Sequence, residues 1–116
     1  MIKEAYNSPI VTATDITTDV WVQVIKKLVA EAWKVTYKYD NFDAGIDYDF
    51  VILEKDGEEI LFGWDNWFEG EVQSSEPKMI EIEQMMNQSF KRGESQNLTP
   101  GLITLHRKWQ VENKWG

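Results

Sequence analysis

The chain has 116 residues, of which 42% are apolar and none is cysteine. This length suits one compact domain with its own core, and the absence of cysteine excludes disulfides and thiolate chemistry. We expect a single domain over 1–116, with an arm at 1–15 and a linker at 94–100 before a C-terminal element. No apolar run reaches the 18 or so residues that a membrane span needs, and we find no apolar signal-peptide segment. We therefore expect a cytoplasmic protein.

The net charge of −8 is unevenly distributed along the chain. Residues 40–71 contain eleven acids and one base, Lys55, and so carry −10, whereas the remaining residues carry +2. Such a segment would repel nucleic acid and anionic membranes and would attract a basic partner. The alternative is that the acids serve only solubility.

The N-terminal part predicts a helix after a short edge strand near Ile10–Thr12. Thr17 or Thr18 can cap a helix over 18–33, and Asp19 suits its first turn. The apolar residues recur at three- and four-residue spacing, as on the buried face of a helix. This stripe consists of Trp21, Ile25, Leu28 and Ala32, widened by Val24 and Val29.

The next segment predicts strands. Alternation over 34–39 places Val35, Tyr37 and Tyr39 on one side of a strand. A hairpin follows around Asp56-Gly57. A two-residue loop would pair Glu54 with Glu59, whereas a three-residue loop over 55–57 would pair Glu54 with Glu58. We favour the three-residue loop, because it makes one face continuously apolar by aligning cross-strand pairs. Those pairs are Ile52 with Ile60, Phe50 with Phe62, and Tyr48 with Trp64.

The stretch GWDNWFEGE, residues 63–71, combines aromatic and acidic side chains. Asp65-Asn66 is typical of a turn. We expect Trp64 and Phe68 to face the core. The residues expected to point away from it are Trp67, Glu69 and Glu71.

Two more elements complete the chain. Ser74 or Ser75 can cap a helix that ends at Gly93, with Met79, Ile82, Met86 and Phe90 as its apolar stripe. Thr99-Pro100 can begin a further helix over 100–113 with Leu102, Leu105 and Trp109 on one face, although this segment could instead be a strand. The fold class is α+β: an N-terminal helix, an antiparallel three- to four-stranded meander, and one or two C-terminal helices packed on one sheet face, giving two layers.

Motifs for catalysis are weak. His106, the only histidine, has no serine or cysteine in a nucleophile context, and its basic neighbours favour a surface position. No register of residues 40–49 fits an EF-hand, although a cation site of another kind could use Asp40, Asp43, Asp47 and Asp49. Paired carboxylates with tryptophan could serve a glycosidase, but twenty acids give such pairs by chance. We expect no enzyme activity, no cofactor and no metal.

The composition favours a binding surface, because protein interfaces are rich in tryptophan ringed by polar groups. We expect a non-enzymatic protein-binding module, most concretely a small acidic bacterial immunity or inhibitor-type protein that binds a basic protein such as a toxin. The alternatives are a small carbohydrate- or ligand-binding domain and an oligomerising structural subunit, so a homo-oligomer is possible. The residues predicted to contact the partner are Asp40, Asp43, Asp47, Asp65, Trp67, Glu69 and Glu71.

Overall fold

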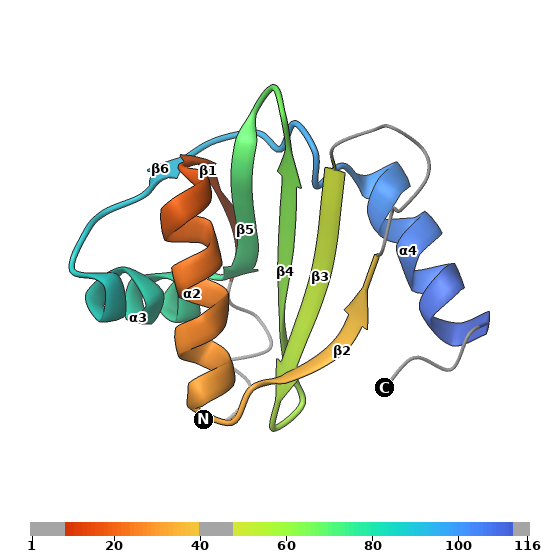
Figure 1. Ribbon diagram of the computed structural model, residues 1–116, viewed down its shortest axis with the longest axis horizontal. Helices are drawn as coiled ribbons and strands as arrows, with labels where there is room; N and C mark the ends of the chain where they lie inside the picture. The colour runs from red at the N-terminus through yellow and green to blue at the C-terminus, as the bar shows by residue number, and fades with distance from the viewer. Residues whose placement is uncertain (1–8, 40–47, 113–116) are drawn as a thin grey trace.

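The computed structural model describes residues 9–39 and 48–112. Within these ranges, the strands form one antiparallel sheet of six in the order β2-β3-β4-β5-β1-β6, accompanied by three helices (Figure 1). The α+β class is confirmed, but the sheet is larger than the predicted three- to four-stranded meander. The elements are β1 (Ile10–Ile16), α2 (Thr18–Ala30), β2 (Lys34–Lys38), β3 (Tyr48–Lys55), β4 (Glu58–Asp65), β5 (Glu69–Ser75), α3 (Glu76–Met86), β6 (Lys91–Arg92) and α4 (Pro100–Glu112).

Strand β1 is longer than the predicted edge strand and lies inside the sheet, between β5 and β6. Its pairing with β5 shifts between Ala13 and Ile16, where Asp15 has a φ of 57°. Side chains three positions apart on a regular strand face opposite sides. The bulge therefore allows both Ala13 and Ile16 to join the same core.

Helix α2 begins at the predicted residue but ends before the predicted Trp33. Ala32 has a φ of 77°, and the N–H of Trp33 donates to the carbonyl of Leu28 at 3.1 Å. This reversal turns Trp33 back into the core, where it is 5% exposed. Of the predicted stripe, Trp21, Val24 and Leu28 are buried, whereas Val29 and Ala32 are exposed.

Helix α3 has the predicted Ser75 cap, whose Oγ accepts from the Lys78 N–H at 3.4 Å. The prediction that this helix continues to Gly93 is wrong. It ends at Met86, and the C-cap residue Asn87 has a left-handed φ of 57°, a conformation that asparagine tolerates at a helix end. The residues expected in its last turn form β6 instead, where Arg92 pairs with Glu83 at 2.8 Å and ties the strand to α3.

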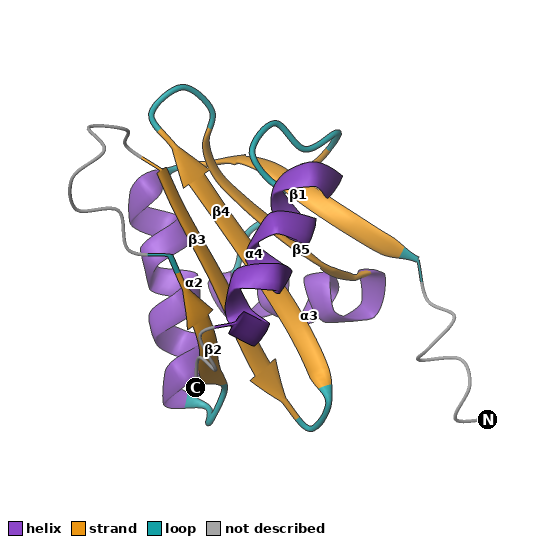
Figure 2. Cartoon of the chain, turned by 90° about the vertical axis from the view of Figure 1, so that its right-hand side faces the viewer, coloured by secondary structure: helices purple, strands orange, loops and turns teal. Residues whose placement is uncertain are grey.

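The C-terminal segment is the helix α4, as predicted, and not a strand. The expected two-layer arrangement is nevertheless wrong. Helices α2 and α3 cover one face of the sheet and α4 lies on the other (Figure 2). The central strands require this, because residues 50–53 of β3 are all buried, and a strand buried on both faces needs a cover on each side.

The register that we favoured for the β3–β4 hairpin is also wrong. The observed loop has two residues, and Glu54 pairs with Glu59. Asp56 and Gly57 have φ values of 53° and 82°, and positive values at both loop residues match the turn that suits a twisted hairpin. Trp64 therefore pairs with Asp49 rather than with Tyr48. Our preference assumed one apolar face, whereas both faces are apolar in the folded chain.

Strand β2 does not keep the regular alternation predicted for 34–39. Its register with β3 shifts between Val35 and Tyr37. Val35 consequently packs against the core under α2 and α3, while Tyr37 belongs to the core under α4. Tyr39 also packs on the α4 side.

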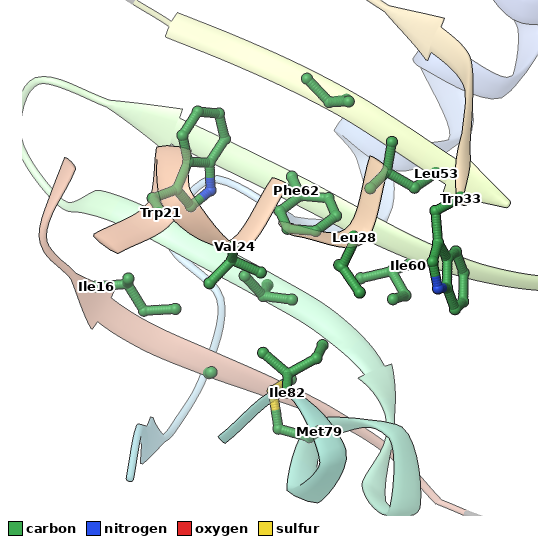
Figure 3. Close-up of a cluster of buried hydrophobic side chains, with 13 residues drawn as sticks. Ile16, Trp21, Val24, Leu28, Trp33, Leu53, Ile60, Phe62, Met79 and Ile82 are labelled. Carbon is green, nitrogen blue, oxygen red and sulfur yellow. The ribbon is translucent and has the colours of Figure 1, made fainter. Parts of the chain in front are cut away.

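The two faces of the sheet carry different cores. The core under α2 and α3 is mainly aliphatic, with Trp21 set edge-on to Phe62 at 6.2 Å between ring centres (Figure 3). The core under α4 is aromatic and holds a histidine. Its buried apolar residues are Tyr37, Phe50, Ile52, Leu61 and Leu98, with Tyr39, Tyr48, Ile103 and Trp109 packed against them.

Candidate functional site

The turn between β4 and β5 presents two aromatic side chains to solvent. Trp67 is 76% exposed and Phe68 is 44% exposed. The exposure of Trp67 agrees with our expectation. The prediction that Phe68 faces the core is wrong. We call residues 65–69 the aromatic turn, which lies at the end of the sheet opposite the β3–β4 hairpin (Figure 1).

The aromatic turn is held in shape by its first residue. Asp65 Oδ1 accepts from the backbone N–H of Trp67 at 3.0 Å and from that of Phe68 at 2.6 Å. Aspartate commonly closes turns through such side-chain to backbone bonds. Asp65 pairs across the sheet with Glu69, so three residues are left in the loop and Phe68 stays outside the strand. An aspartate three positions before Phe68 was the signal that the sequence offered for this exposure.

Glu69 joins the aromatic turn to the start of α2. Its Oε1 accepts from the Thr18 N–H at 3.1 Å, at the N-terminus of a helix where a carboxylate is favourable. Trp64 Nε1 donates to the Thr18 hydroxyl at 2.9 Å. The turn is therefore anchored to both the sheet and a helix. Asp65 and Glu69 position Trp67, whereas we had expected all three to act together as contacts.

The expectation that Glu71 points away from the core is wrong. Its side chain is fully buried, and its carboxylate accepts from three backbone N–H groups: Gln96 at 2.7 Å, Leu98 at 3.1 Å and Asn97 at 3.2 Å. These bonds satisfy a charge that would otherwise be costly to bury. Glu71 thus holds the segment that leads to α4 against the sheet, and its buried side chain is not accessible to a partner.

His106 is fully buried, which contradicts the predicted surface position. Helix α4 places it in an aromatic cage, stacked on Phe50 with ring centres 4.1 Å apart. Its Nδ1 lies 2.7 Å from the Tyr37 hydroxyl, and its Nε2 contacts the Tyr48 hydroxyl. The His106 cluster comprises His106, Tyr37, Tyr39, Tyr48, Phe50 and Trp109.

Burial shifts the ionisation of the His106 cluster away from neutral pH. It lowers the pKa of His106 to about 4, because a low-dielectric site disfavours the imidazolium. It raises the pKa of Tyr37 to about 12 and that of Tyr48 further, with the nearby Tyr39 adding to both shifts. At pH 7 all three groups are therefore neutral, which fits a hydrogen-bonded core.

The predicted contact residues have different places in the fold. Asp65, Trp67 and Glu69 lie together in the aromatic turn, while Glu71 lies beneath the segment before α4. Asp40, Asp43 and Asp47 lie outside the described residues. No group of three or more His, Asp or Glu side chains gathers as metal ligands in the part that the structure describes.

Comparisons with known proteins give no relative for this chain: no protein-family model, no curated protein and no solved structure matches it. Among the helices in the described ranges, none combines the length and the apolar composition that crossing a membrane requires. The assignment of a site consequently depends on the geometry of the residues themselves. The aromatic turn is the candidate, since it exposes two aromatic side chains on a preformed loop.

Proposed function

We propose that the protein is a non-enzymatic protein-binding module that uses the aromatic turn to anchor a basic protein. The observation that carries the proposal is the exposure of Trp67 on a turn fixed by Asp65 and Glu69. Interface anchors are typically aromatic, and rigid placement reduces the entropy lost on binding. Phe68, beside Trp67, extends the apolar contact.

Charge supports a basic partner. Segment 40–71, which contains the aromatic turn, carries −10, whereas the rest of the chain carries +2. Complementary charge accelerates encounter and selects against acidic competitors. In this proposal the acids attract the partner from a distance, and Trp67 and Phe68 make the close contact.

The most concrete form of the proposal is a bacterial immunity or inhibitor-type protein acting in the cytoplasm. A basic toxin that acts on nucleic acid has a cationic substrate site, and an acidic surface can occupy such a site in the substrate's place. The cage around His106 supports a non-enzymatic reading, because the only histidine is enclosed by packed rings. No cofactor enters this proposal.

The test is capture of a partner from the native host at low salt, followed by its identification and purification. We expect a basic protein whose affinity falls about tenfold between roughly 0.05 M and 0.5 M salt. Trp67→Ala should abolish capture. Val111→Ala is the matched control, since Val111 is a 75% exposed apolar side chain on α4, and it should capture normally.

Two outcomes would replace this proposal. If oligosaccharides bind through Trp67 without salt dependence, the chain is a carbohydrate-binding domain, because stacking on a ring needs no net charge. If the molecular mass rises with concentration and Trp67→Ala prevents the rise, the turn instead meets a second copy of the chain. A partner that binds equally well to Trp67→Ala would reject the aromatic turn as the anchor.

A further inference from the structure

A groove opens at the other end of the molecule from the aromatic turn. It has a volume of about 530 Å³ and lies between the C-terminal end of α2, the β3–β4 hairpin and α3. This volume falls within the range of small-molecule sites. The apolar part of its lining consists of Leu28, Trp33, Ile82 and Met85 (Figure 3 shows the first three).

The charges that line the groove favour a cation. Four acids and two lysines give the lining a net charge of −2. The lysines already have partners: Lys78 Nζ lies 2.8 Å from Glu81 and 3.8 Å from Glu58, and Lys55 Nζ donates to the Glu31 carbonyl at 2.8 Å. An anion would have to break these contacts and face the remaining acids.

Lys78 also shows where an ammonium group fits. Its Nζ lies 5.4 Å from the centre of the Trp33 ring, within the distance at which an aromatic face attracts a cation. The ring of Trp33 and the carboxylates of Glu58 and Glu81 thus form one cation position. At the rim, Glu31 and Asp56 carry carboxylates that form no ion pair within 9–39 and 48–112.

We propose that this groove binds a linear organic diamine. One ammonium group lies between Glu31 and Asp56, and the other shares the carboxylates of Glu81 and Glu58 with Lys78. The methylene chain packs on Leu28 and Met85, and the two positive charges match the −2 of the lining. This site is independent of the aromatic turn, so either can fail without the other.

The test is an NMR titration of the whole chain with cadaverine, followed on the indole N–H of Trp33 and the methyl of Met85. We expect saturable shifts at both reporters and none at the indole of Trp67. Glutarate, a dianion of the same carbon length, should shift neither reporter. Cadaverine that gives no saturable shift up to about 10 mM, or glutarate that binds equally well, would overturn the proposal.

Charge-neutral variants distinguish the groove from general acidity. The pair Glu31→Gln/Asp56→Asn should weaken cadaverine about tenfold. The control pair Glu94→Gln/Glu112→Gln removes the same charge from exposed positions outside the groove and should leave the affinity unchanged. Equal weakening by both pairs would mean non-specific attraction and would overturn the proposal.

Lys78→Met sharpens the test further. It removes the competing internal ammonium while keeping an apolar chain over Trp33, so cadaverine should bind about tenfold more tightly. Weaker cadaverine binding by this variant would show that Lys78 does not occupy a cation position, and the proposal would then be rejected.

Discussion

The aromatic turn and the sheet face under α4 are both built from aromatic and ionisable side chains, yet they use them in opposite ways. At the turn, Asp65 and Glu69 bind backbone N–H groups so that Trp67 is held out in solvent. Under α4, the rings enclose His106, and Glu71 is buried beneath the chain that it binds. The first region exposes its aromatic side chains, and the second encloses them in the core.

Aromatic and acidic composition therefore does not distinguish an exposed surface from a core. Glu69 and Glu71 are two residues apart on one strand, but one is exposed and the other fully buried. Mutations at the two regions should therefore separate stability from binding.

Glu71→Ala should have the largest effect on stability. It leaves the N–H groups of residues 96–98 without their acceptor, two of them buried, which should lower the free energy of unfolding by about 4 kcal/mol. Urea unfolding monitored by circular dichroism measures the change. Glu94→Ala, at an exposed acid in the same connection, should stay within about 0.5 kcal/mol of the parent. If Glu71→Ala lowers the free energy of unfolding by less than about 1 kcal/mol, Glu71 does not hold residues 96–98 in place.

The next largest effect is the pH dependence that His106 confers. Its pKa is about 4 in the folded chain, against the ordinary histidine value of 6.5 in the unfolded chain. As pH falls, the unfolded state therefore binds the proton first. Its stabilising contribution is complete above pH 6.5 and is lost progressively down to about pH 4, by up to about 3 kcal/mol.

Comparison of the parent with His106→Phe isolates this effect from the titration of the acids. The variant keeps an aromatic ring but cannot be protonated. Unfolding free energies of both proteins between pH 7 and pH 4 should show a steeper fall for the parent. Parallel curves would mean that His106 titrates normally and is accessible to water.

Gly63→Ala tests how closely the connection to α4 packs on the sheet. A Cβ at Gly63 would overlap Asn97 Oδ1 and would lie 2.8 Å from the side chain of Leu98. Relieving that overlap should cost about 2 kcal/mol in urea unfolding. Gly101→Ala is the matched control, because nothing lies within 4 Å of its Cβ position, and it should be neutral or slightly stabilising. Equal effects of the two substitutions would rule out tight packing here.

Asp65→Ala addresses the aromatic turn and should cost only about 1 kcal/mol, because two hydrogen bonds at an exposed loop are replaced by water. Asp65→Asn retains the Oδ1 acceptor and should cost a few tenths of that. In NMR, the alanine variant should also broaden or shift the amides of Trp67 and Phe68. Unchanged amides would show that Asp65 does not order the turn.

The sequence predicted the parts of the fold that local chemistry determines. The start of α2 with its buried Trp21 and Leu28, the Ser75 cap and the exposure of Trp67 follow from spacing and from residues close in the chain. Three failures share one cause, namely that we assumed one buried sheet face. With two, the hairpin takes the two-residue loop, α4 covers the second face, and the outward side of β5 becomes buried at Glu71.

The buried roles of His106 and Glu71 were not predictable from their neighbours. Each depends on partners at least 25 residues away in the chain: Glu71 on Gln96 and the two residues after it, and His106 on Tyr37 and Tyr48. The bulges at Asp15 and in β2 likewise arise from pairing between strands rather than from local preference.

The most direct test of the central claim is the affinity of the purified partner for the parent and for Trp67→Ala, measured by titration calorimetry beside urea unfolding of both. If Trp67 anchors the partner, the affinity of the variant should be at least about 30-fold weaker, the loss typical of an interface anchor. Its unfolding free energy should stay within about 0.5 kcal/mol of the parent. Equal affinities, or a loss of affinity matched by a loss of stability, would reject Trp67 as the anchor.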